Sequence, residues 1–163
     1  MRLLLLLLVL ASCSPSSAAA TPSPSPPAAL ASTSPCSAGS VHTGARPPWL
    51  EEAGAHNNPD IPYVIATPEI AAGFLFADPL RAGHPVDPSN KILWVVGKPR
   101  NGSDLKLSAH PLGASTPVVN DSFPDNSSPG EIYPSIFDVP SPGCWELELR
   151  WAGNVARVDV TYT

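Results

Sequence analysis

Trp145-Glu146-Leu147-Glu148-Leu149-Arg150-Trp151, near the end of the chain, alternates apolar and charged residues without exception. Because successive side chains of a strand point to opposite faces, this period of two predicts a strand with one buried and one solvent-exposed face. Residues 155–162 repeat the period and place Ala156, Val158, Val160 and Tyr162 on one side. Ala152-Gly153-Asn154 lies between the two and is typical of a hairpin turn. We therefore expect an antiparallel hairpin here.

Further strands are predicted upstream of this hairpin. Residues 91–96 (KILWVV) are β-branched and aromatic, which favours a buried strand. After turn residues at 98–103, Leu105, Leu107 and Ala109 alternate with polar residues, which predicts a second hairpin. Two earlier strands are expected at 63–66 and 73–77, and a short one, interrupted by Pro134, within 132–139. Residues 49–53 are long enough for one helical turn.

The whole pattern predicts an all-β fold. About seven short strands fall within roughly 100 residues and are separated by turn signals, as in two-layer antiparallel sandwiches. The chain contains 22 prolines among 163 residues. Proline lacks an N–H and breaks helix interiors, so this composition suits strands and loops better than helices. We expect an antiparallel two-sheet sandwich.

Two short motifs carry a resemblance to known proteins. Asp138-Val139-Pro140-Ser141-Pro142-Gly143-Cys144-Trp145-Glu146-Leu147 resembles the entry to a late strand in bacterial immunoglobulin-like domains. Together with Lys91-Ile92-Leu93-Trp94, it is also similar to a group of secreted actinobacterial lipoproteins. The resemblance covers about residues 49–162 and implies an immunoglobulin-like sandwich and an exported location, but no activity. The usual immunoglobulin pair of core cysteines on facing strands is absent.

The N-terminus has the pattern of a lipoprotein signal peptide. Met1-Arg2 precedes an eight-residue apolar run, Leu3 to Leu10, which is far shorter than the ~20 residues of a membrane span. Leu10-Ala11-Ser12-Cys13 matches the bacterial lipobox: an aliphatic residue, two small residues and the cysteine that receives lipid. The alternative is an ordinary signal peptide that is cut after Ala18, Ala19 or Ala20.

These features predict three segments. Residues 1–12 are the signal peptide, and residues 13–35 are the lipidated Cys13 followed by a disordered tether of Ser, Ala, Thr and Pro. The 22 residues 14–35 reach at most about 70 Å at ~3.1 Å each. Residues 36–163 form the sandwich domain. The acylated chain, carrying palmitate or a similar fatty acid, is expected on the extracytoplasmic face of the bacterial cell membrane.

Two cysteines remain after Cys13 is assigned to the lipid. An even pair in an exported protein favours a disulfide between Cys36 and Cys144. Successive side chains of a strand point to opposite faces, so Cys144 points away from the face that carries Trp145 and Leu147. It is therefore expected off the core face. A free buried thiol at Cys144 is the alternative.

Charge excludes some classes of partner. The net charge is −5, and removing Arg2 with the leader leaves 8 basic against 14 acidic side chains, or −6. Nucleic-acid binding needs a clustered basic surface, so we expect no nucleic-acid partner. The same balance argues against electrostatic docking to anionic lipid.

No catalytic or cofactor motif is present. His42, His56, His84 and His110 form no short-spaced ligand pair, and no nucleophile elbow or phosphate loop occurs. We therefore expect no enzyme, no cofactor and no metal site. The expected function is a non-enzymatic binding or interaction module with a protein or cell-envelope partner. The alternatives are a sensor or metal-binding lipoprotein that uses the histidines, and, less favoured, an envelope hydrolase.

Residues 111–130 show little periodicity, and a loop of this length in a small domain is either functional or disordered. This loop and the segment 49–62 are the predicted binding surface, with Trp49, His56, His84 and Phe123 as the candidate residues. Val118, Val119 and Phe123 of this loop could instead tuck under a sandwich edge. In that alternative, both segments simply cover the edges of the sheets.

Overall fold

The structure is a computed structural model that describes residues 36, 41–54, 60–114 and 119–163. All of these belong to one compact unit, Ser32–Thr163. The predicted signal peptide, Cys13, the tether, His56 and Val118 lie outside the described residues. The elements are β1 Val41–His42, α1 Pro48–Glu52, β2 Tyr63–Ile65, β3 Ala71–Leu75, the 3₁₀ turn η1 Pro88–Asn90, β4 Lys91–Val96, β5 Leu105–Pro111, β6 Val119–Phe123, β7 Ile132–Ile136, β8 Gly143–Trp151 and β9 Asn154–Tyr162.

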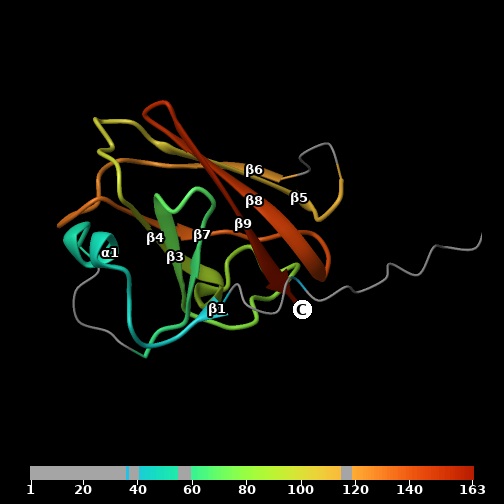
Figure 1. Cartoon of the computed structure of the whole chain (residues 1–163). Coiled ribbons are helices and arrows are strands. Elements are labelled where there is room, and N and C mark those ends of the chain that lie inside the picture. The colour runs from blue at the N-terminus through green and yellow to red at the C-terminus, as the bar shows by residue number, and fades with distance from the viewer. Residues whose placement is uncertain (1–35, 37–40, 55–59, 115–118) are drawn as a thin grey trace, which may run out of the picture. The chain divides into compact units, whose positions relative to one another are not determined.

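The strands form two antiparallel sheets, one of order β1-β2-β3-β4-β7 and one of order β6-β5-β8-β9. Figure 1 shows the layers, with β3, β4 and β7 in one and β5, β6, β8 and β9 in the other. The predicted β-sandwich is confirmed. The described residues contain nine strands rather than about seven, because β1 is a two-residue pairing and β6 lies in a segment predicted to be a loop.

The C-terminal hairpin is confirmed, and β8 pairs with β9 from Gly143↔Tyr162 to Trp151↔Asn154. The turn needs two residues with positive φ, which Ala152 (43°) and Gly153 (82°) supply. This combination is the two-residue turn whose twist matches a hairpin. The inward residues of both strands, such as Leu147 and Val158, are buried.

The second predicted hairpin is wrong. β4 and β5 lie in different sheets, and β5 pairs with β6 and β8 instead. The turn at 98–103 carries the chain from one layer to the other. The indole N–H of Trp151 donates to the Lys98 carbonyl (3.2 Å), and the Tyr133 hydroxyl donates to the Ser103 carbonyl (2.6 Å). Alternation predicts which face of a strand is buried, but not which strand lies beside it.

Two other strands differ from the prediction. The strand expected at 73–77 lies at Ala71–Leu75, and Pro134 lies within the continuous strand β7 instead of interrupting it. Because β7 is an edge strand of its sheet, a residue without an N–H is tolerated there. The one-turn helix expected at 49–53 is present as α1.

The segment 111–130 is also corrected, since it contains β6. Val119 and Phe123 pack against the main core, while the residues between them are exposed. The residues that follow β6 are bound by Arg100. Its guanidinium forms ion pairs with Asp125 (2.7 Å) and Glu131 (3.3 Å) and donates to the Ser127 carbonyl (3.0 Å). This part of the segment is held against the domain.

The main core lies between the sheets and includes Trp94, Trp145, Trp151, Tyr133 and Leu107. A second apolar cluster lies on the outer face of the five-stranded sheet. There, Leu50 of α1 is buried against Tyr63, Phe74 and Val95. Among the described residues, no helix is long and apolar enough to cross a membrane.

The predicted disulfide between Cys36 and Cys144 is present, with the Cα atoms 5.2 Å apart. Cys144 pairs across the sheet with the exposed Thr161 and lies outside the core cluster, as the alternation of the strand predicted. The bond attaches the first residue of the predicted domain to the start of β8.

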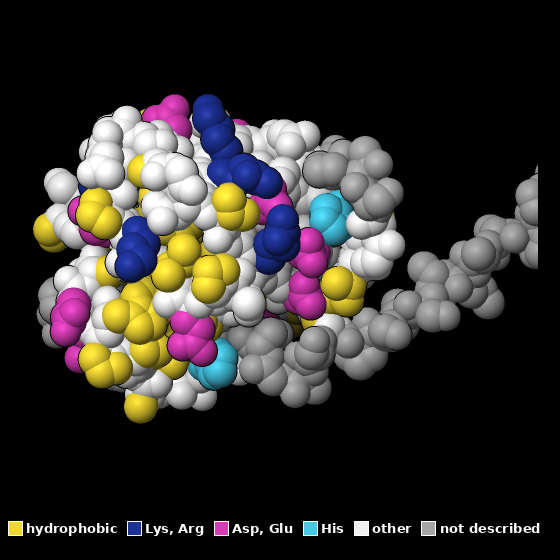
Figure 2. All heavy atoms as spheres, turned by 45° about the horizontal axis from the view of Figure 1, so that its top comes forward, with side chains coloured by type: hydrophobic (Ala, Val, Ile, Leu, Met, Phe, Trp, Pro, Cys, Tyr) yellow, Lys and Arg dark blue, Asp and Glu magenta, His cyan; other side chains and the backbone are white. Residues whose placement is uncertain are grey.

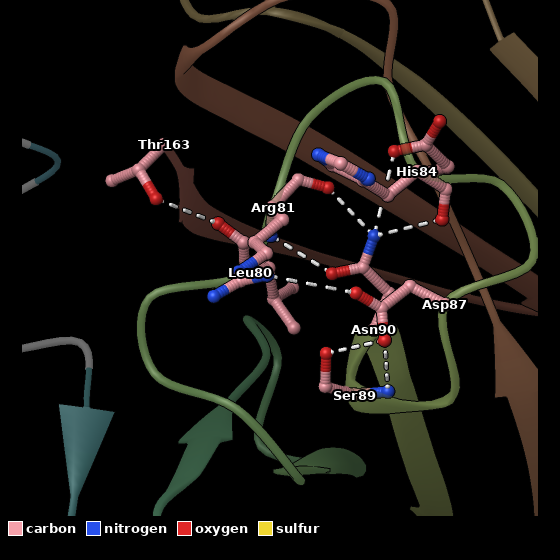
Figure 3. A network of polar contacts seen from close by, with 8 residues as sticks. Leu80, Arg81, His84, Asp87, Ser89, Asn90 and Thr163 are labelled. Atoms are coloured by element: carbon pink, nitrogen blue, oxygen red, sulfur yellow. Dashed lines mark hydrogen bonds and ion pairs between the residues drawn. The ribbon is translucent and has the colours of Figure 1, made fainter.

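The free edge of β9 is covered by loop segments. Thr67 exchanges two backbone hydrogen bonds with Arg157, and the strap formed by residues 77–90 bonds the last residues of the chain through Leu80 and Ala82. The strap is held from within by Asn90, a fully buried side chain. Its amide nitrogen donates to the carbonyls of Arg81 (2.6 Å) and His84 (3.3 Å), and its oxygen accepts from the Arg81 N–H (2.8 Å) (Figure 3).

Candidate binding face

The outer face of β5, β8 and β9 carries a grid of polar side chains. These strands bury one set of alternating residues in the core, so the other set points outward. Figure 2 shows basic, acidic and histidine side chains side by side on one surface of the molecule. Cross-strand pairing places the outward residues in rows: His110, Glu146 and Asp159; Ser108, Glu148 and Arg157; and Lys106, Arg150 and Val155.

Glu148 is the centre of the middle row. Its side chain is 15% exposed, and it accepts hydrogen bonds from Arg150 (2.5 Å) and from Arg157. Burial alone would raise the pKa of Glu148, but the two arginines outweigh it and hold that pKa below its ordinary value. Glu148 is therefore an ionised carboxylate fixed between two guanidinium groups.

The neighbouring row brings two acids together. Glu146 lies 3.3 Å from His110 Nε2 and 3.6 Å from Arg157 Nε, and it is directly opposite Asp159. Burial raises the pKa of Asp159, and the Glu146 charge raises it further, while His110 partly opposes both. This end of the face therefore carries a strained pair of like charges.

Two shallow hollows adjoin these rows and share Glu146 and Arg157. The larger, about 520 Å³, is lined by Ser108, His110, Gly113, Ala114, Glu148 and the shared pair. The smaller, about 280 Å³, is lined by Ile65, Thr67, Val158, Asp159 and the shared pair. The face thus presents both signs of charge on rigid strands, which suits a polar or charged partner.

The larger hollow holds a serine, a histidine and a glutamate, but not in a nucleophilic arrangement. A histidine base needs one ring nitrogen free to accept the serine proton. In His110, Nδ1 lies 3.1 Å from the Pro111 carbonyl oxygen and Nε2 lies 3.3 Å from the Glu146 carboxylate. Both nitrogens face acceptors, and no hydrogen bond joins His110 to Ser108 among the described residues.

The predicted binding residues are not brought together. Trp49 packs in the outer cluster over Gly97, where a Cβ would lie 2.9 Å from the indole. Phe123 packs against the main core from β6, and His84 lies in the strap. No contact joins any two of these three, and His56 is not among the described residues. The alternating pattern of β8 and β9 predicted that their outward residues face solvent, but it did not predict a binding surface there.

The described histidines are also separate. His42 stacks on Tyr63 with the ring centroids 5.3 Å apart, His84 lies in the strap, and His110 pairs with Glu146. Over the part of the chain that the structure describes, no three His, Cys, Asp or Glu side chains are placed to hold a metal ion.

Comparison with protein-family models, with curated proteins and with solved structures finds no significant match to this chain.

Opposite stability effects are expected from neutralising the two central acids. Asp159→Asn should raise the free energy of unfolding at pH 7 by about 0.2–1 kcal/mol, because it removes the like-charge pair. Glu148→Gln should lower it by up to about 1 kcal/mol, because it removes an ion-paired carboxylate. The raised pKa of Asp159 makes its charge a cost above that pKa, and the lowered pKa of Glu148 makes its charge a gain.

The Asp159 difference should shrink toward zero as the pH falls through its raised pKa to the ordinary carboxyl range, whereas the Glu148 difference should persist to lower pH, because the folded pKa of Glu148 is lowered. Urea unfolding of the two variants and the wild type at pH 7 and pH 3 measures this. Shifts of the same sign at pH 7 would show that the charge network is described wrongly.

Proposed function

We propose that this chain is a membrane-anchored extracytoplasmic lipoprotein whose immunoglobulin-like β-sandwich is a non-enzymatic binding or interaction module. The observation that carries the proposal is the lipobox Leu10-Ala11-Ser12-Cys13 directly after an eight-residue apolar run. A signal-peptide core of that length places the cleavage site where the lipobox lies. Acylation of Cys13 then supplies more than one fatty chain, which is what stable anchoring requires.

The described domain supports this use in two ways. The bond between Cys36 and Cys144 suits an oxidising, extracytoplasmic compartment. The outer face of β5, β8 and β9 offers a fixed pattern of charges and two hollows to a partner, while both ring nitrogens of its histidine face acceptors other than serine. These features favour recognition over covalent chemistry.

The anchor is tested by metabolic labelling with palmitate in the bacterium that makes the chain. We expect the wild-type protein to carry the label, and Cys13→Ser to carry none, because the thiol of Cys13 starts the lipidation. The double variant Cys36→Ser, Cys144→Ser is the matched control and should keep the label. Label on the Cys13→Ser protein, or none on the wild type, would rule the anchor out.

A further inference from the structure

Among the described residues, four of the five exposed large hydrophobic side chains lie toward one end of the sandwich. Phe76 is 46% exposed, Val86 86%, Leu112 45% and Ile136 39%. Monomeric proteins expose single hydrophobic residues routinely, so their number is ordinary and their common position is the informative point. We name these four residues the apolar rim.

Two of the four, Phe76 and Ile136, flank Lys91 in the sheet, and Val86 lies in the strap. Phe76 follows β3, and its N–H donates to the Lys91 carbonyl, while Ile136 pairs with Lys91 from the other side. One row across the start of β4 thus contains Phe76, Lys91 and Ile136. The Lys91 ammonium lies 4.7 Å from the centre of the Phe76 ring. Val86 lies in the strap between His84 and Asp87, whose backbones are hydrogen-bonded to each other.

The same end carries the disulfide. The Leu112 N–H donates to the carbonyl of Cys144, the residue bonded to Cys36. Cys144 pairs with Thr161, and the Thr161 carbonyl accepts the Leu80 N–H of the strap. In Figure 1 the yellow-green strap runs beside the C-terminal end of β9. By contrast, α1 lies at the other end of β4, with Trp49 over Gly97.

The position of the rim relative to the anchor points to its partner. The tether predicted from the sequence joins the domain at Cys36, whose disulfide partner Cys144 lies at the same end of the sandwich as the rim, so the rim is at the end of the domain where the tether is attached. We propose that the apolar rim docks into the interfacial layer of the membrane that carries Cys13. The proposal rests on the lipid anchor of the proposed function.

The chemistry of this end favours lipid contact through apolar groups. Lys91 and Arg81 are offset by Asp78 and Asp87 within the same region, so no net positive charge draws it to anionic headgroups. A tether of at most ~70 Å keeps the domain at an effective concentration in the millimolar range near the surface. At that concentration, a weak apolar contact is enough to orient the domain.

The test uses the mature chain, residues 13–163, with Cys13→Ser, so that neither the leader nor the lipid contributes to binding. This chain contains the whole described unit. Co-sedimentation with phosphatidylcholine vesicles at millimolar lipid measures the bound fraction. The triple variant Phe76→Ser, Val86→Ser, Leu112→Ser removes most of the rim. Val41→Ser is the matched control, because Val41 is 40% exposed but pairs with Val64 near the middle of β2.

We expect the triple variant to bind at least 5-fold more weakly than the parent, the Val41→Ser control to bind like the parent, and added salt to change neither. Melting temperatures check that the variants are folded. No binding of the parent above background, or equal binding by the parent and the triple variant, would overturn membrane docking by this rim. Neither result would affect palmitate labelling of Cys13, so failure of the docking and failure of the anchor are distinguishable.

Discussion

Replacing Cys36 and Cys144 together with serine is expected to lower the free energy of unfolding by about 4 kcal/mol. The two cysteines are 108 positions apart, so the bond closes a loop that covers most of the domain. Removing such a cross-link returns a large conformational entropy to the unfolded chain. Cys144 lies off the core face, so serine there leaves no cavity between the sheets. Urea unfolding of the oxidised wild type and the double variant measures the loss.

Reduction of the wild type provides the matched control, because it breaks the bond without changing a side chain elsewhere. Reduced wild type and the double variant should unfold at the same urea concentration, and Cys13→Ser in the mature chain should unfold like the oxidised wild type. A loss below about 1 kcal/mol would mean that the bond does not cross-link the native domain in solution.

Asn90→Ala is expected to cost about 2–4 kcal/mol, because a buried amide that bonds the strap backbone is lost. The substitution leaves the Arg81 N–H and the Arg81 and His84 carbonyls without their partner. The strap should then separate from β9, and the amides of Leu80, Ala82 and Thr163 should exchange faster with solvent. Urea unfolding and amide hydrogen exchange measure the two effects.

Two further substitutions, one at the same position and one at the preceding residue, sharpen this test. Asn90→Asp keeps the acceptor for the Arg81 N–H but loses the donors to both carbonyls, so it should also destabilise the strap. Ser89→Ala removes only the hydrogen bond to Asp87 and should cost less than about 1 kcal/mol. If Asn90→Ala costs no more than Ser89→Ala, the strap is not held by Asn90.

The sequence predicts which face of a strand is buried more easily than it predicts which strand lies beside it. The period of two in β8 and β9 correctly predicted the hairpin and its buried face, and the alternation of β8 correctly placed Cys144 off the core face. The turn at 98–103 has the residues of a hairpin turn, yet it crosses between the sheets. Its hydrogen bonds to Trp151 and Tyr133 come from strands distant in sequence. No local pattern encodes such contacts.

β6 escaped prediction for a related reason. Its sequence, VNDSF, carries three polar residues in succession, because an edge strand faces solvent on one side and along its free edge. The candidate binding face escaped because a row such as His110, Glu146 and Asp159 draws one residue from each of three strands. Only the order of the strands in the sheet makes them neighbours.

We propose that the chain is held at the membrane by Cys13 and is closed by the disulfide between Cys36 and Cys144. The most direct measurement is the intact mass of the protein recovered from the native membrane fraction, before and after reduction and alkylation. We expect a chain that begins at Cys13, carries acyl mass, and gains two alkyl groups only after reduction. An unacylated chain that begins beyond Ala18, or cysteines that alkylate without reduction, would contradict it.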